Sequence, residues 1–224
     1  MNMYLHIGHG KTGSSYLQSW LACNAELLKN QSHLLYPTHK EENQLNFRAS
    51  FGEFSMGNGL LLNEMCTMPN TRPKRWLRSL LSDNSVRRKD IKGIILSSEA
   101  LANQIPDLIL SLLKRREQLG FSKISILMFV RDPVDHACSV YSQMVKRHGY
   151  YSNIDQWFQS YNFTERLLRC LKIISSYPID MDLKVEHYGR NKLSIISMLQ
   201  SWLQIDPLKS WNSPPATCVN RSLT

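Results

Sequence analysis

A lysine and three hydroxyl residues lie in a short glycine-rich stretch near the start of the chain, where residues 8–15 read Gly-His-Gly-Lys-Thr-Gly-Ser-Ser. Backbone N–H groups, hydroxyl groups and an ammonium group gathered in one turn can together bind a phosphate or a sulfate. The glycines allow the backbone conformations that such a turn needs. The residues expected to hold the anion are Gly10, Lys11, Thr12, Gly13, Ser14 and Ser15.

The residues on either side predict the elements that position this turn. Residues 3–7 form an apolar run typical of a buried strand, and residues 16–21 have apolar side chains at helical spacing. A strand, a tight turn and a helix in this order direct a helix N-terminus toward an anion. The position of the lysine differs from that in nucleotide triphosphatases. The Walker pattern places the lysine directly after the last glycine of the turn, whereas Lys11 precedes Gly13.

A second candidate site follows another apolar run, residues 124–130, which leads into Arg131-Asp132-Pro133. Ser139 lies eight positions beyond Arg131, about two helical turns along the helix expected there. The guanidinium group offers a fixed fork of donors and the serine a hydroxyl, so the two could grip a phosphate from two sides. In the alternative interpretation Pro133 is an early helix residue, Asp132 caps the helix, and Arg131 is a solvated charge.

These segments resemble the two signatures of the sulfotransferases that use 3′-phosphoadenosine 5′-phosphosulfate (PAPS), in the form typical of the bacterial or carbohydrate-type branch. The first signature, Lys-Thr/Ser-Gly-Thr/Ser-Ser/Thr, matches residues 11–15, and the second, Val-Arg-Asp/Asn-Pro with a later serine, matches residues 130–139. The resemblance implies PAPS as co-substrate, no metal, and a 3′-phosphate held by Arg131 and Ser139. It departs near the C-terminus, where the Lys-Gly-rich segment of the cytosolic enzymes is missing, and residues 220–223 are either its replacement or a frayed end.

Sulfuryl transfer needs an activated acceptor and stabilisation of the charge that builds on the leaving phosphate oxygen. Lys11 is the natural partner of that oxygen, because its ammonium is a point charge on a flexible stem. Glu99 is the first candidate for the general base, since it follows the strand expected at 91–96. His9 is the rival candidate, and the resemblance implies either a glutamate or a histidine. His6 lies within an apolar run and is expected to be a hydrogen-bonded core histidine.

Metal chemistry is not expected, because His6 and His9 have no carboxylate or cysteine partner at ligand spacing. The five cysteines are scattered without a Cys-x-x-Cys pair, which favours reduced thiols and a cytoplasmic protein. No apolar stretch is long enough to span a bilayer, and no secretory signal is evident. The first alternative function is a P-loop kinase or nucleotidase, although no convincing magnesium-holding aspartate follows an apolar strand.

The net charge of +9 would attract a highly anionic nucleotide. Much of the excess lies in residues 72–92, and a solvated helix face, an acidic-acceptor site or a nucleic-acid patch would all produce it. A non-catalytic binder of anionic polymers is the second alternative function, while nucleic acid is not the expected partner. We expect the polar segment 38–59 and the basic stretch 72–92 to frame an acceptor cleft suited to a carbohydrate or another hydroxyl-bearing molecule.

The alternation of strands and helices predicts an α/β, P-loop-like three-layer fold with a central, mainly parallel sheet flanked by helices. Length and ordinary composition favour one domain over residues 1–224, with a polar loop or lid at 37–59 and a surface tail at 204–224. Strands are expected at 3–7, 32–36, 91–96, 124–130 and 181–186. Helices are expected at 13–29, 72–81, 105–119, from the Arg-Asp-Pro segment to 148, and at 154–161, 163–175 and 191–203.

Overall fold

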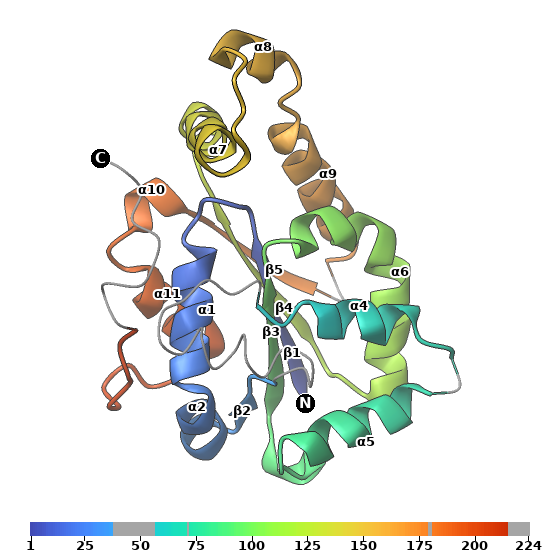
Figure 1. Ribbon diagram of the computed structural model, residues 1–224. Coiled ribbons are helices and arrows are strands. Elements are labelled where there is room, and N and C mark those ends of the chain that lie inside the picture. The colour runs from blue at the N-terminus through green and yellow to red at the C-terminus, as the bar shows by residue number, and fades with distance from the viewer. Residues whose placement is uncertain (38–56, 71, 179–180, 215–224) are drawn as a thin grey trace.

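The computed structural model of the chain describes residues 1–37, 57–70, 72–178 and 181–214. Its centre is a five-stranded sheet in the order β2-β3-β1-β4-β5, in which every neighbouring pair is parallel (Figure 1). The strands are β1 (Asn2–Gly8), β2 (Leu34–Leu35), β3 (Gly93–Ser98), β4 (Ile124–Val130) and β5 (Met181–His187). All five expected strands are present, although the one predicted at 32–36 is shortened to two residues.

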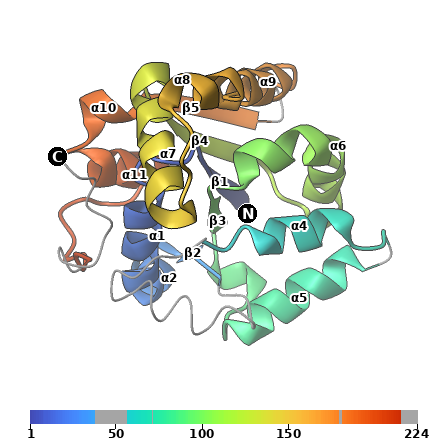
Figure 2. The same ribbon diagram turned by 45° about the horizontal axis from the view of Figure 1, so that its top comes forward.

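Helices cover both faces of the sheet (Figures 1 and 2). One face carries α1 (Ser14–Cys23), α2 (Ala25–Ser32) and α11 (Ile195–Leu203), packed on Tyr4, Ile95, Leu127 and Phe129. The other carries α4 (Leu60–Thr67), α5 (Pro73–Asp83), α6 (Leu101–Leu119) and α9 (Phe163–Ser175), packed on Met3, Leu5, Ile94, Ile126 and Met128. Successive residues of one strand thus enter two separate cores, because side chains alternate across a sheet. The predicted three-layer α/β fold is confirmed.

The parallel register places the ends of the three central strands level with one another. His6 lies opposite Ser97 and Ile7 opposite Ser98 in β3, while Gly8 lies opposite Phe129 in β4. In a parallel sheet all carboxyl ends meet at one edge, and ligands of such sheets bind beyond that edge. The residues that follow β1, β3 and β4 therefore share one edge of the sheet.

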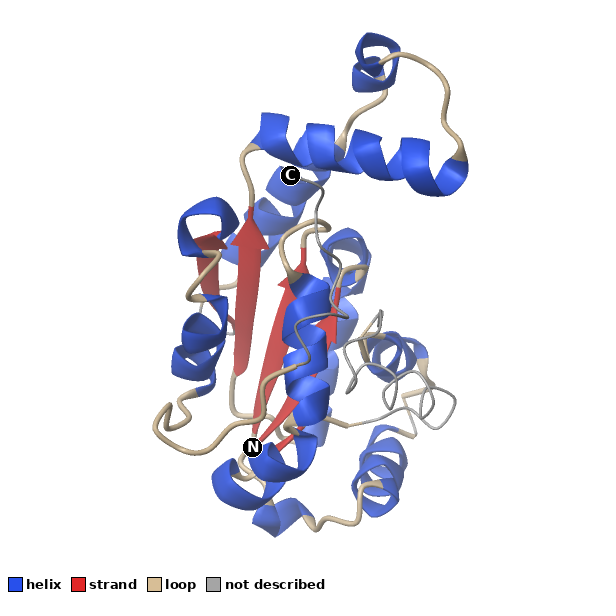
Figure 3. Ribbon diagram, turned by 60° about the vertical axis from the view of Figure 1, so that its left-hand side comes forward, coloured by secondary structure: helices blue, strands red, loops and turns tan. Residues whose placement is uncertain are grey.

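The helix that follows β4 lies across this carboxyl edge of the sheet. It is α7 (Pro133–His148), and α8 (Ile154–Gln159) projects beyond it (Figure 3). Asp132 caps α7 by accepting hydrogen bonds from the backbone N–H groups of Val134 and Asp135, at 2.9 and 3.1 Å. Pro133 occupies the first turn, where its missing N–H costs nothing. The start of α7 is therefore determined by its own local sequence.

Three of the expected helices have different boundaries in the structure. The helix predicted at 13–29 divides into α1 and α2 at Asn24, whose side-chain amide donates to the carbonyls of Trp20 at 2.8 Å and Asn212 at 2.9 Å. Such side-chain bonds compete with the helical pattern of the backbone. The helix predicted at 191–203 begins later, with α11 at Ile195, and the short α10 (Tyr188–Asn191) precedes it. The helix predicted at 105–119 begins earlier, since α6 starts at Leu101, well before its internal proline.

The helix α4 was not expected from the sequence pattern. Its apolar side chains Leu61, Leu62 and Met65 are buried in the larger core, so tertiary packing stabilises a stretch that follows two glycines. Most of the polar loop or lid predicted at 37–59, and residues 215–224 of the predicted tail, lie outside the described residues. No helix in the described ranges combines the length and apolar character that a membrane crossing requires.

Candidate active site

The turn between β1 and α1 has the backbone shape of an anion site. Lys11 and Gly13 both adopt left-handed backbone conformations, with φ of 65° and 80°. Lysine rarely adopts this conformation, so the surrounding structure must hold it there. Gly13 is tightly enclosed as well, since a methyl group added to it would lie 2.9 Å from a ring carbon of Tyr188. The first N–H groups of α1, beginning at Ser14, have no partner within the helix and are directed toward the turn.

Glu99 lies beside this turn. A methyl group added to Gly8 would come within 2.6 Å of the Glu99 Cα atom and 2.9 Å of the Ser14 hydroxyl oxygen, so only glycine permits this approach of two chains. The carboxylate oxygen Oε2 of Glu99 lies 3.8 Å from the point where a side chain of Gly10 would begin. The carboxylate that follows β3 and the turn that follows β1 are thus neighbours, as predicted from their shared sheet edge.

The hydroxyl groups of the turn differ in their surroundings. Thr12 is fully buried and its hydroxyl donates to the carbonyl of His9, so Thr12 can offer an anion only its backbone N–H. The hydroxyl of Ser14 is buried without a hydrogen-bond partner among the described residues, and Ser15 is half-buried. A buried hydroxyl without a partner costs free energy, which a bound anion at this position would recover.

Arg131 extends from the end of β4 toward the turn. One guanidinium nitrogen, Nη1, lies 3.5 Å from the carbonyl oxygen of Lys11, and the side chain is half-buried. Arg131 is therefore partly covered and directed to the turn, and the capping role that the alternative interpretation gave to Asp132 is confirmed. Ser139 is half-buried on α7, one turn beyond His136 and on a neighbouring part of the same helix face.

His136 is a site residue that the sequence analysis missed. It is fully buried, and its ring bridges the turn and the segment after α8: Nε2 lies 2.9 Å from the carbonyl oxygen of Gly10, and Nδ1 lies 2.7 Å from the hydroxyl oxygen of Tyr161. Because a carbonyl can only accept, Nε2 carries the proton and Nδ1 accepts from Tyr161. Burial lowers the pKa of His136, the hydrogen bond to the Gly10 carbonyl partly opposes this, and the nearby charges of Arg131 and Lys11 lower the pKa further. The signal available in the sequence was its place one turn into the helix after Arg131.

His9 stacks on His136, with ring centroids 4.0 Å apart and planes 19° from parallel. Only 6% of its surface is exposed, and neither ring nitrogen has a hydrogen-bond partner within the part of the chain that the structure describes. Burial, followed by the charge of His136, lowers its pKa to about 4. His6 is the core histidine expected from sequence: its Nδ1 lies 2.8 Å from the Ser97 hydroxyl oxygen, and burial lowers its pKa to about 4.

The basic stretch 72–92 does not reach this site, so the expectation that it frames an acceptor cleft is wrong. Its last residues lie at the amino ends of the strands: the N–H of Lys92 donates to the carbonyl of His33 at 2.7 Å, and the N–H of Asn2 donates to the carbonyl of Lys92 at 2.7 Å. Arg88 donates to the carbonyl of Leu119, at the end of α6, at 2.7 Å. Sequence proximity to the polar segment suggested a shared cleft. The basic stretch instead ends at the amino end of β3, whereas the candidate site lies at the carboxyl end of that strand.

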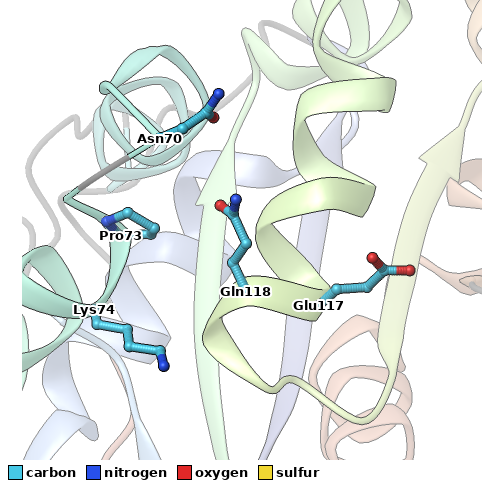
Figure 4. A pocket seen from close by; sticks show the side chains of 5 residues that line it. All are labelled: Asn70, Pro73, Lys74, Glu117 and Gln118. Atoms are coloured by element: carbon cyan, nitrogen blue, oxygen red, sulfur yellow. The ribbon is translucent and has the colours of Figure 1, made fainter.

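A pocket on this distal side is lined by Asn70, Pro73, Lys74, Glu117 and Gln118 (Figure 4). Gln118 lies near the end of α6, whose start follows Glu99, so the helix separates the pocket from the turn by roughly 25 Å. Arg115 already binds the side-chain oxygens of Asn70 at 3.0 Å and Gln118 at 2.7 Å. This pocket is therefore separate from the candidate active site, and Arg115 of α6 already holds two of its polar side chains, Asn70 and Gln118.

Aromatic rings continue from His136 along the segment between α8 and α9. The Tyr161 ring stacks on Phe158 and on Phe163, with centroids 5.5 and 5.6 Å apart, and the His136 ring lies 5.4 Å from Phe163. Phe158 is 45% exposed, while Tyr161 and Phe163 are partly buried. Phe158, Tyr161 and Phe163 form an aromatic row that begins beside the turn. Within the described ranges, no group of three or more His, Cys, Asp or Glu residues could hold a metal ion.

The fold is shared with sulfotransferases. The structure superposes on that of the sulfotransferase from Alicyclobacillus acidocaldarius with a TM-score of 0.50 and 14% identity, over 95% of this chain and 85% of that one. Further matches are the sulfotransferase domain of the curacin biosynthetic pathway (TM-score 0.46, 16% identity, 92% and 74% coverage) and retinol dehydratase in complex with androsterone and the inactive cofactor PAP (TM-score 0.36, 13% identity, 90% and 58% coverage). No family model matches the sequence, and a search of curated proteins finds no match. At these identities the likeness establishes the fold, and the reaction must be argued from the site.

Proposed function

We propose that this protein is a sulfotransferase that moves the sulfuryl group of PAPS to a hydroxyl or amine of an acceptor. The observation that supports the proposal is the meeting of three chain segments at one sheet edge: the turn with Lys11 after β1, Glu99 after β3, and Arg131 after β4. The two cations Lys11 and Arg131 and a set of N–H donors suit an anionic donor, and a carboxylate beside them suits deprotonation of an acceptor.

In this mechanism the N–H groups of the turn and of the first turn of α1 bind the 5′-phosphate, with the Ser14 and Ser15 hydroxyls. Arg131 and Ser139 bind the 3′-phosphate. The acceptor oxygen or nitrogen attacks sulfur in line while the bond from sulfur to the phosphate oxygen breaks, and the acceptor proton passes to Glu99. Lys11 stabilises the charge that builds on the leaving oxygen. Positioning and electrostatics thus supply most of the rate enhancement, as in phosphoryl transfer.

A nucleotide titration tests this function most directly. The protein should be stabilised against heat by adenosine 3′,5′-bisphosphate without magnesium, and Lys11→Ala should retain the fold while losing transfer from PAPS. Each nucleotide, the bisphosphate and ATP, is titrated with and without magnesium, and the shift in melting temperature is recorded. A preference for magnesium-ATP would instead support the kinase or nucleotidase alternative and would refute the proposal.

We further propose a carbohydrate or another hydroxyl-rich ring as the acceptor. The support comes from the aromatic row of Phe158, Tyr161 and Phe163, since the apolar face of a sugar ring packs well on aromatic rings and this row begins beside the turn. Glycans, phenols and steroids are assayed with labelled PAPS. Sulfation of glycans that falls at least several-fold in Phe158→Ala is the expected result, whereas efficient sulfation of small phenols alone would argue against this acceptor class.

A further inference from the structure

Three successive carbonyl groups of the turn accept hydrogen bonds from side chains. The carbonyl of His9 accepts from the Thr12 hydroxyl, that of Gly10 from Nε2 of His136, and that of Lys11 from Nη1 of Arg131. The bonds from His136 and Arg131 come from outside the turn, from α7 and from the end of β4. The contact of Arg131 is long, at 3.5 Å, whereas that of His136 is 2.9 Å and joins a fully buried ring to the half-buried Gly10.

The direction of these bonds has a consequence for the N–H groups. In a trans peptide the C=O and the N–H of the next residue point in opposite directions. A carbonyl of Gly10 held toward α7 therefore turns the N–H of Lys11 away from α7. In the same way, a carbonyl of Lys11 held toward Arg131 turns the N–H of Thr12 away from Arg131. Lys11 also has a left-handed φ of 65°, a conformation that persists only where neighbouring groups hold it.

We propose that His136 is a positioning residue of the anion site: its Nε2–H fixes the Gly10 carbonyl so that the loop N–H groups face the anion, and Tyr161 keeps the ring in the required tautomer. This inference rests on the proposed function only in taking the nucleotide as the anion. Tyr161 performs its part because its hydroxyl, 2.7 Å from Nδ1, donates there and leaves the proton on Nε2. The ring of His9 stacks on the imidazole of His136 and packs against one of its faces.

Two substitutions separate this role from simple packing. His136→Gln retains an N–H donor at about the reach of Nε2, whereas His136→Ala removes it. Removing one partly buried hydrogen bond of this kind should weaken binding of adenosine 3′,5′-bisphosphate about tenfold, as measured by calorimetry. His136→Gln should recover most of the loss. Equal affinity in His136→Ala and the wild type, or equal loss in the Gln and Ala variants with both folded by circular dichroism, would overturn the proposal.

Tyr161→Phe tests the tautomer without disturbing the core. In the wild type, ring 15N–1H spectra of labelled histidine should show His136 with its proton on Nε2. Tyr161→Phe should show a mixture of tautomers and bind the bisphosphate about two- to threefold more weakly. The matched control is Tyr141→Phe, which removes a hydroxyl that donates to the Ser152 carbonyl at 2.9 Å on the same group of helices. It should change neither readout, and an Nδ1–H tautomer in the wild type would refute the inference.

The outcomes distinguish this inference from the proposed function. Suppose that the protein binds inorganic sulfate, that His136→Ala weakens this binding, and that the protein does not prefer the bisphosphate over magnesium-ATP. The positioning role then stands and the sulfotransferase proposal fails. If the bisphosphate binds without magnesium but equally well to all His136 and Tyr161 variants, the function stands and the positioning role fails.

Discussion

In the proposed reaction, Glu99 and His9 are the two candidates predicted for the base, and their surroundings differ. Glu99 has its carboxylate beside Gly10, at the end of a central strand. His9 is buried beneath the ring of His136, and a group with a pKa of about 4 takes up a proton only weakly at neutral pH. These observations favour Glu99 as the base.

Glu99→Gln keeps the size of the side chain and removes its charge. PAPS binding should survive while turnover falls by about 10²–10⁴, the range expected for loss of a general base. Single-turnover rates and PAPS affinity are measured in parallel, with His9→Asn as the companion variant. Full turnover in Glu99→Gln combined with loss in His9→Asn would transfer the role to the histidine.

The element that organises the site is the corner between β4 and α7. The strand ends at Val130, Arg131 follows it, Asp132 caps the helix, and His136 and Ser139 lie within the first two turns of α7. The capping bonds hold the start of α7 over the sheet edge, and His136 ties the same helix to the turn. A helix anchored in this way can present Arg131 and Ser139 to one ligand with little ordering cost on binding.

From the geometry of this corner we expect substitutions of Arg131 and Ser139 to affect binding of the 3′-phosphate. Arg131→Ala should weaken binding of adenosine 3′,5′-bisphosphate by about 1.5–3 kcal/mol, the usual effect of losing a charge-assisted hydrogen bond, and Ser139→Ala should weaken it by less. Adenosine 5′-phosphosulfate, which lacks the 3′-phosphate, should bind nearly unchanged in calorimetric titrations. Lys146→Ala removes an equal charge from the exposed far end of α7 and serves as the control. Equal losses of binding free energy for both nucleotides would show that Arg131 does not bind the 3′-phosphate.

At the scale of the whole molecule, two buried histidines on β1 and in the turn couple stability to pH. The pKa values of His6 and His9 are both lowered from 6.5 to about 4, chiefly by burial. Their stabilising effect is therefore fully present above pH 6.5 and is lost as the pH falls toward 4, because the unfolded chain takes up protons that the folded chain excludes. A lowering of this size corresponds to about 3 kcal/mol for each group.

The free energy of unfolding should accordingly be constant from pH 8 to about 7 and fall by roughly 2 kcal/mol per buried histidine on reaching pH 5. Urea unfolding at several pH values measures this decline. His9→Asn should reduce it, whereas replacement of the exposed His148 by glutamine should not. A flat profile between pH 7 and 5 would contradict the burial that the fold assigns to these rings.

The sequence by itself determined the features that depend on neighbouring residues. The order strand, glycine-rich turn and helix around Lys11, the cap at Asp132 and the apolar runs of β1, β3 and β4 follow from local spacing and residue type. The class of fold followed as well, because alternating strands and helices leave few ways to bury a parallel sheet. The place of Glu99 was predictable because carboxyl ends of parallel strands share an edge.

The tertiary structure alone decided which distant groups meet. The bonds of His136 to Gly10 and Tyr161, and the stacking of His9, join residues 25 to 127 positions apart, for which no local pattern exists. The place of the basic stretch 72–92 was also decided by the tertiary structure. Its nearness in the sequence suggested that it belongs to the site, but it ends at the amino edge of the sheet, opposite the site. Local propensity acts within a few residues, whereas strand register and packing set the contacts between residues that are remote in the sequence. The environment of each candidate site residue is therefore defined only in the folded chain.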